Sequence, residues 1–159
     1  MIISEWDNNI TYSNKSLETE DLKFKNNKKL IGVFVKEIID YNHILYTQRG
    51  LFTNRYWKKF EVMGNYTGIL TKKNNGKYLA NLYRSEDDES ELGIDAENIG
   101  NELRYINHYK NIQDKPNCKF VDSIIDGKNH ILVVVIEDIP SYKEVLIDYG
   151  EDYCKYYNI

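Results

Sequence analysis

The side chains that could do chemistry in this sequence are dominated by tyrosine. The chain of 159 residues contains 14 tyrosines, 3 histidines and 2 cysteines. A tyrosine ring can cover a pocket while its hydroxyl still finds a hydrogen-bond partner. An AT-rich genome would also enrich tyrosine and asparagine, so composition alone leaves both interpretations open.

Most familiar catalytic and metal-binding patterns are absent from the sequence. Two cysteines, Cys118 and Cys154, cannot form a disulfide-rich scaffold or a four-cysteine zinc site. The histidines lack the spacing of helical metal ligands, and no nucleophile elbow or phosphate-binding loop is present. We therefore predict no metal, and we interpret Cys118 and His130 as structural residues.

Short strands are the elements that must position these side chains. The clearest signal is a pair of apolar runs on either side of Asp126-Gly127, which predicts a β-hairpin. Residues 48–62 fit either an insertion or a short helix, and the apolar spacing within 94–106 predicts a short helix. An acidic run at 86–89 predicts a solvated loop. Further strands are expected at 30–35, from 44, at 64–70, 78–83 and 145–147.

Bulk properties favour one soluble, intracellular domain in the cytoplasm or nucleus. Hydrophobic residues make up 42% and charged residues 29% of the chain, and the net charge is −4. There is no signal peptide and no apolar run long enough to cross a membrane. The acidic balance argues against direct nucleic-acid binding and suits a basic protein partner. The sequence does not predict an oligomeric state.

Five segments in a fixed order carry a more specific signal. They are Leu30-Ile31-Gly32-Val33-Phe34, Gly64-Asn65-Tyr66-Thr67-Gly68, a central element from Ile94-Asp95-Ala96 to Asn107-His108, Pro116-Asn117-Cys118, and Lys143-Glu144 to Asp148-Tyr149-Gly150. Together they resemble the SET domain family of protein-lysine methyltransferases. Each segment alone is weak, but their order across about 29–153 is hard to obtain by accident.

The resemblance implies a fold class and a domain organisation. The fold would be mostly β with a few short helices, a SET-type β-clip of small curved sheets. Near the C-terminus it would contain a knot-like crossing, in which the chain through Asn107-His108 passes under the segment that ends at Tyr149. Residues 1–28 would be an N-terminal flanking segment, 29–150 the SET domain and 151–159 a short tyrosine-rich tail.

The resemblance also implies an activity, the transfer of a methyl group from S-adenosyl-L-methionine to a protein lysine. Histone tails are the first substrates to expect. The implied cofactor-binding residues are Leu30, Ile31, Gly32, Arg104, Asn107, His108 and Tyr149. The implied catalytic residues are Tyr66 and Tyr149. The implied substrate channel is formed by Tyr66, Phe120, Ile147 and Tyr153. In place of a zinc-binding tail, we expect Tyr153, Tyr156 and Tyr157 to pack over this channel.

The sequence departs from the family pattern at several positions, and the departures at Leu30 and Leu92 support a different interpretation. Leu30 stands where the family has a glycine, Leu92 where many members have an aromatic residue, and Tyr142 where a turn glycine is usual. The stretch 40–63 is also longer than the usual connection. An alternative is therefore a SET-like domain that has lost activity and binds proteins, and a third is an unrelated β domain that binds a peptide.

Overall fold

The fold is mostly β, as predicted, and it is built from several small sheets. The computed structural model describes residues 3–18, 23, 25–72, 76–82 and 92–159. The strands are β1 (Thr11–Tyr12), β2 (Val33–Glu37), β3 (Arg49–Thr53), β4 (Val62–Tyr66), β5 (Ile69–Thr71), β6 (Leu79–Asn81), β7 (Gly93–Asp95), β8 (Ile99–Gly100), β9 (Asn107–His108), β10 (Cys118–Ile125), β11 (Lys128–Val135) and β12 (Leu146–Ile147). The helices are the 3₁₀ helix η2 (Glu102–Tyr105) and α1 (Glu151–Tyr157).

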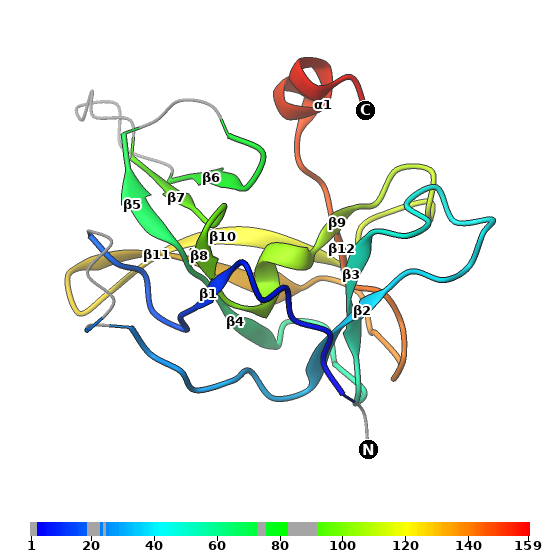
Figure 1. The fold of residues 1–159 in the computed structure, drawn as a ribbon, viewed down its shortest axis with the longest axis horizontal. Coiled ribbons are helices and arrows are strands. Elements are labelled where there is room, and N and C mark those ends of the chain that lie inside the picture. The colour runs from blue at the N-terminus through cyan, green and yellow to red at the C-terminus, as the bar shows by residue number, and fades with distance from the viewer. Residues whose placement is uncertain (1–2, 19–22, 24, 73–75, 83–91) are drawn as a thin grey trace.

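The predicted hairpin is present as β10 and β11. The two strands pair antiparallel up to Ile125 and Lys128, which leaves Asp126-Gly127 as a two-residue turn. Both turn residues have positive φ, 50° and 73°, as a type I′ turn requires. Strand β4 extends this hairpin into a three-stranded sheet. In Figure 1 the sheet β5-β7-β6 lies toward one end of this long hairpin, and the pair β2-β3 toward the other.

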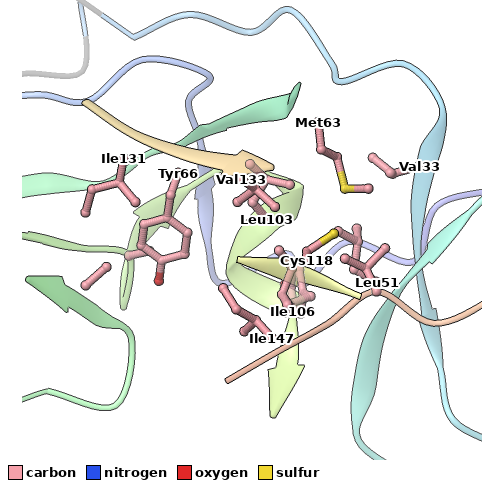
Figure 2. Packing of buried hydrophobic residues seen from close by; sticks show 14 of the residues in the cluster. Val33, Leu51, Met63, Tyr66, Leu103, Ile106, Cys118, Ile131, Val133 and Ile147 are labelled. Atoms are coloured by element: carbon pink, nitrogen blue, oxygen red, sulfur yellow. The ribbon is translucent and has the colours of Figure 1, made fainter. Parts of the chain in front are cut away.

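The hydrophobic core lies between the small sheets and η2. Leu103 and Ile106, at the helix and just after it, pack with Val133 of β11 and Leu51 of β3 (Figure 2). Cys118 is fully buried in the same cluster, and burial raises the pKa of its thiol to about 12. The cysteine is therefore an inert core residue, as predicted.

The expectation of a strand beginning at Ile44 was wrong. Residues 40–47 form successive turns, and the strand begins at Arg49 instead. Backbone hydrogen bonds between Ile38 and the residues Thr47 and Gln48 close this loop between β2 and β3. Ile44 is 57% exposed, so its apolar character has no sheet face to bury. The helix considered within 48–62 is absent, because β3 begins at Arg49 and the residues between β3 and β4 form bends and turns.

The predicted helix within 94–106 forms only in part. Gly93–Asp95 is the central strand β7, paired with both β5 and β6, and helical structure begins only at Glu102. The side chain of Asn101 accepts a hydrogen bond from the backbone of Leu103, which caps the helix at that point. The apolar spacing that resembled one helix is thus divided between two strands and η2. The acidic run at 86–89 and Tyr83 lie outside the described residues.

Residues near the N-terminus pack into the domain. Strand β1 pairs in parallel with β8, and Tyr12 is buried there. The Tyr12 hydroxyl donates a 2.8 Å hydrogen bond to Glu102 in η2. The ring of Trp6 contacts the rings of Tyr12 and Tyr105 edge to face. In the described part of the chain, no helix is both long and apolar enough to span a bilayer.

Candidate functional site

A short parallel pair of strands brings two sequence-predicted segments together. Asn107 pairs with Leu146 and His108 with Ile147, although they lie far apart in the sequence. The side-chain nitrogen of Asn117 donates to the carbonyl of Glu144, just before β12, and its side-chain oxygen accepts the N–H of Leu146 in β12, each at 2.8 Å. This arrangement holds Tyr149 next to His108.

His108 is held as a neutral ring. Its Nδ1 atom accepts the backbone N–H of Tyr149 at 3.1 Å, and its Nε2 atom lies 3.5 Å from the sulfur of Cys154. Because Nδ1 is an acceptor, the neutral ring carries its hydrogen on Nε2. Burial lowers the pKa of His108, and the charge of Asp148 and the backbone of Ile147 offset this shift only in part. The histidine therefore acts as a fixed hydrogen-bonding group that links β9 to α1.

Two cavities meet beside Tyr149. The larger, of about 900 Å³, is lined mainly by residues from the segments 44–49, 104–112, 149–153 and 157–159. The smaller, of about 380 Å³, is lined mainly by residues from 77–81, from 103–106 and from 149–153, together with Tyr66 and Phe120. Five residues line both cavities: Lys77, Tyr78, Arg104, Tyr149 and Tyr153.

The two tyrosines predicted to be catalytic both line the small cavity. Tyr149 donates its hydroxyl hydrogen to the carbonyl of Ile106 at 2.6 Å, and Tyr66 donates to the carbonyl of Tyr78 at 2.7 Å. Burial raises the pKa of both phenols, so each stays protonated at neutral pH. With the hydrogens engaged, the lone pairs of both oxygens can accept hydrogen bonds. Neither residue can serve as a phenolate base.

Arg104 places a positive charge at the wall between the cavities. Its Nε and Nη2 atoms donate to the carbonyls of Ala96 and Glu97, at 2.8 and 3.1 Å. The guanidinium lies 4.2 Å from the ring centre of Tyr78. The side chain is buried and held in place by these contacts. Its main contribution to the site is therefore its positive charge rather than N–H groups that could bind a ligand.

Asn107 is oriented by hydrogen bonds to its side-chain nitrogen. Nδ2 donates to the carbonyl of Arg49 at 3.2 Å and to Oε1 of Glu144 at 3.0 Å. These acceptors use both amide hydrogens and fix which end of the amide carries the nitrogen. A Cβ atom on Gly50 would lie only 2.8 Å from Glu144 and 3.3 Å from Asn107. Glycine at position 50 therefore allows this close approach.

The structure does not bring Leu30, Ile31 and Gly32 to either cavity. The backbone N–H of Leu30 donates to Glu102, Ile31 is 80% exposed, and Gly32 accepts a hydrogen bond from Trp57. The segment precedes β2, and β3 is the strand of this hairpin that adjoins Asn107. Ile147 also lines neither cavity, because β12 turns its side chain into the core (Figure 2).

The C-terminal residues form the helix α1 beside both cavities. Tyr153 lines both and donates its hydroxyl to the carbonyl of Lys77 at 2.6 Å, and Tyr157 lines the large cavity. Tyr156 is 67% exposed, so its expected packing over the channel was wrong. Among the described residues, no group of three or more acidic, histidine or cysteine side chains could hold a metal ion.

Comparison with known proteins identifies the family and agrees with the fold. The SET domain family matches residues 48–150, and the chain belongs to that family. The fold is similar to a chain of Polycomb repressive complex 2 from Chaetomium thermophilum (TM-score 0.62, 22% identity), covering 76% of this chain and 15% of that one. It is also similar to ATXR5 in complex with histone H3.1 (TM-score 0.60, 18% identity), covering 92% of this chain and 80% of that one. At these identities the likeness is one of fold.

Sequence reasoning missed the segment that leads into β3 and reaches the large cavity. Thr47, Gln48 and Arg49 line this cavity, and the family match begins at residue 48 rather than 30. The sequence did contain a signal for it. Gly50-Leu51-Phe52 repeats the pattern of Gly32-Val33-Phe34, and both segments precede Tyr66. Spacing alone did not show which copy faces the site.

Proposed function

We propose that this SET domain is an S-adenosyl-L-methionine-dependent protein-lysine methyltransferase. One observation carries the proposal: a large and a small cavity share a wall made by Tyr78, Arg104, Tyr149 and Tyr153. Methyl transfer between two bound molecules needs the acceptor nitrogen in line with the donor's methyl group and in direct contact with it, which two adjoining cavities can provide. S-adenosyl-L-methionine, when bound, would supply a methyl group on a positively charged sulfonium.

The lining of the large cavity suits this cofactor. Its volume of about 900 Å³ lies within the range of small-molecule sites. The oxygen of Asn107 is the end of that amide left to accept a hydrogen bond from an ammonium group. The backbone of residues 48–50 would hold polar groups nearby, and the rings of Tyr149, Tyr153 and Tyr157 suit a cation. Gln48 to Gly50 therefore take the role first expected for 30–32.

The small cavity suits a lysine side chain that must lose its proton. A free lysine has a pKa of about 10.4. Apolar walls such as Leu79 and Phe120 disfavour the ammonium form, and the charge of Arg104 disfavours it further. The oxygens of Tyr66 and Tyr149 can accept hydrogen bonds from the amine and orient its lone pair. Catalysis would then rest on alignment and deprotonation rather than on a nucleophilic side chain.

We further propose a basic protein segment, such as a histone tail, as the substrate. The net charge of −4 favours a cationic partner. Glu151 and Asp152, in the first turn of α1, line the small cavity and offer carboxylates to neighbouring basic residues. The structurally similar ATXR5 was crystallised with histone H3.1. Such a substrate would place the protein in the nucleus.

The inactive-domain alternative loses its main support. It rested on Leu30 in place of a cofactor-facing glycine, yet Leu30 lies outside both cavities. The alternative also rested on leucine in place of an aromatic residue at position 92. The backbone carbonyl of Leu92 accepts a hydrogen bond from the N–H of Leu82, and this contact does not depend on the side chain at position 92.

Calorimetry with S-adenosyl-L-methionine tests the proposal. The wild-type protein should bind the cofactor, and Asn107→Ala should weaken binding about ten- to a hundredfold, because one hydrogen bond to a charged group is worth about 1.5–3 kcal/mol. Asn42→Ala, in an exposed loop, is the control. Absence of binding by the wild-type protein would overturn the proposed function. Equal affinity for Asn107→Ala would show that the cofactor assignment of Asn107 is wrong.

A further inference from the structure

His43 reaches toward the site from a loop that precedes the family match. The loop between β2 and β3 is closed by the hydrogen bonds of Ile38, and the matched region begins only at residue 48. The Nδ1 atom of His43 accepts the backbone N–H of Leu45 at 3.0 Å. Its Nε2 atom therefore carries the hydrogen of the neutral ring, and it lies 2.9 Å from Oε2 of Glu144. The His43 side chain is only 16% exposed.

Glu144 connects this histidine to Asn107. One carboxylate oxygen faces His43, and the other accepts the side-chain N–H of Asn107 at 3.0 Å. The carboxylate is 9% exposed and lies against Gly50, which leaves no room for a side chain there. Because the group is planar, fixing one oxygen also fixes the direction of the other. The contact with His43 thus sets the direction in which Glu144 holds Asn107.

The consequence concerns the Oδ1 atom of Asn107. With both Nδ2 hydrogens given to Glu144 and Arg49, the oxygen end of the amide points away from these partners, and Asn107 lines the large cavity. A carbonyl oxygen held in place can select a ligand that carries an ammonium group. Without His43, Glu144 could rotate toward water, and the amide of Asn107 could turn with it.

We infer that His43 is a positioning residue that, through Glu144, orients Asn107 to recognise the amino group of the methyl donor. This inference rests on the proposed function, since it concerns the same cavity. His43 lines neither cavity, and its connection to Asn107 runs through Glu144. It also gives the loop between β2 and β3 a role in ligand selection.

Two ligands separate this role from a general loss of structure. S-adenosyl-L-methionine carries the amino group, and 5′-methylthioadenosine lacks the whole amino-acid part. His43→Ala should bind S-adenosyl-L-methionine about tenfold more weakly while its affinity for 5′-methylthioadenosine stays unchanged. His43→Gln, which keeps an N–H donor, should restore most of the affinity, and Tyr41→Ala in the same loop should match the wild type. Equal losses for both ligands, or no loss for either, would overturn the inference.

A measurement on the ligand-free protein keeps this test independent of the proposed function. The side-chain amide signals of Asn107 in an ¹⁵N NMR spectrum, assigned with Asn107→Asp, report its two hydrogen bonds. His43→Ala should shift these signals and speed their exchange with water, whereas Tyr41→Ala should not. Unchanged signals in His43→Ala would refute the positioning role. A wild-type protein that binds no S-adenosyl-L-methionine would refute the proposed function, and the spectrum would still decide whether His43 holds Asn107.

Discussion

Tyr149 shows how one residue of a common type acquires a particular role. Among 14 tyrosines its side chain has no distinguishing chemistry. Its environment sets it apart: its backbone N–H bonds His108, its hydroxyl bonds the carbonyl of Ile106, and its ring lines both cavities. Burial raises its pKa, so the group stays neutral and serves as an acceptor. A neutral acceptor is what a channel for an uncharged amine requires.

The burial of His108 predicts a dependence of stability on pH. Its pKa in the folded protein lies below the ordinary value of 6.5. Between these two values the unfolded chain binds more protons, so acid favours unfolding. The stabilisation that the neutral His108 ring gives the folded protein is therefore fully present above pH 6.5. It declines below pH 6.5, until the ring is protonated in the folded protein as well. Urea unfolding of the wild type and His108→Asn across this range should show a difference that shrinks with acid. A difference independent of pH would contradict the neutral ring.

Phe120 gives a prediction about the reaction product. It lines the small cavity, and its ring centre lies 5.2 Å from that of Tyr66. Without a hydroxyl, this position leaves room for an amine that already carries methyl groups. If the proposed activity is present, the wild-type protein should therefore form di- or trimethyl-lysine, and Phe120→Tyr should shift the product toward monomethyl-lysine. Mass spectrometry of a substrate peptide measures this, with Phe60→Tyr on the surface as control. A wild-type product that stops at one methyl group would refute it.

At the scale of elements, short segments do the positioning. Strands β9 and β12 have only two residues each, yet their parallel pairing brings Asn107-His108 beside Tyr149. The turn before β12 contains Tyr142 with φ of 64°, where the family usually has glycine. The backbone at Tyr142 thus adopts the positive φ that favours glycine, although the residue carries a side chain. The position of such short elements is set by side-chain hydrogen bonds such as those of Asn117.

Helix α1 predicts the effect of shortening the chain. Only Cys154 is buried within it, so removal of residues 151–159 should leave a folded domain. Tyr153 and Tyr157 would be lost from the large cavity, and removing two aromatic contacts should weaken S-adenosyl-L-methionine binding about ten- to a hundredfold. Calorimetry measures this, and Tyr156→Ala, at an exposed position on the same helix, should bind normally. Full affinity and activity of the shortened chain would show that α1 does not cover the site.

At the scale of the whole molecule, the N-terminal residues belong to the packed structure. Glu102 in η2 holds two segments that precede β2: its Oε2 accepts the hydroxyl of Tyr12, and its Oε1 accepts the N–H of Leu30. Burial and the nearby carboxylate of Glu102 both raise the pKa of Tyr12. We therefore propose that the folding unit extends beyond 29–150 to include β1.

Tyr12→Phe, which removes only the phenolic hydroxyl, tests whether β1 belongs to the folding unit. The change removes a buried hydrogen bond and leaves a carboxylate oxygen of Glu102 without its donor, which should lower the free energy of unfolding by about 1–3 kcal/mol. Deletion of residues 1–28 should lower it further. Urea unfolding measures both, with Tyr41→Phe on the exposed loop as control. A deletion variant as stable as the full chain would restore the boundary at residue 29.

The sequence by itself determined the family, the β-rich fold class and the long hairpin. Hairpins depend on local information, because turn residues such as Asp126-Gly127 and the apolar runs beside them fix pairing and register together. Tertiary structure decided which residues face the cavities. Gly32 and Gly50 lie in nearly identical local patterns, and only the tertiary structure places Gly50 against Asn107 and its neighbours Gln48 and Arg49 at the large cavity. In the same way, Ile147 lies in the core because of contacts with distant segments, which no local pattern encodes.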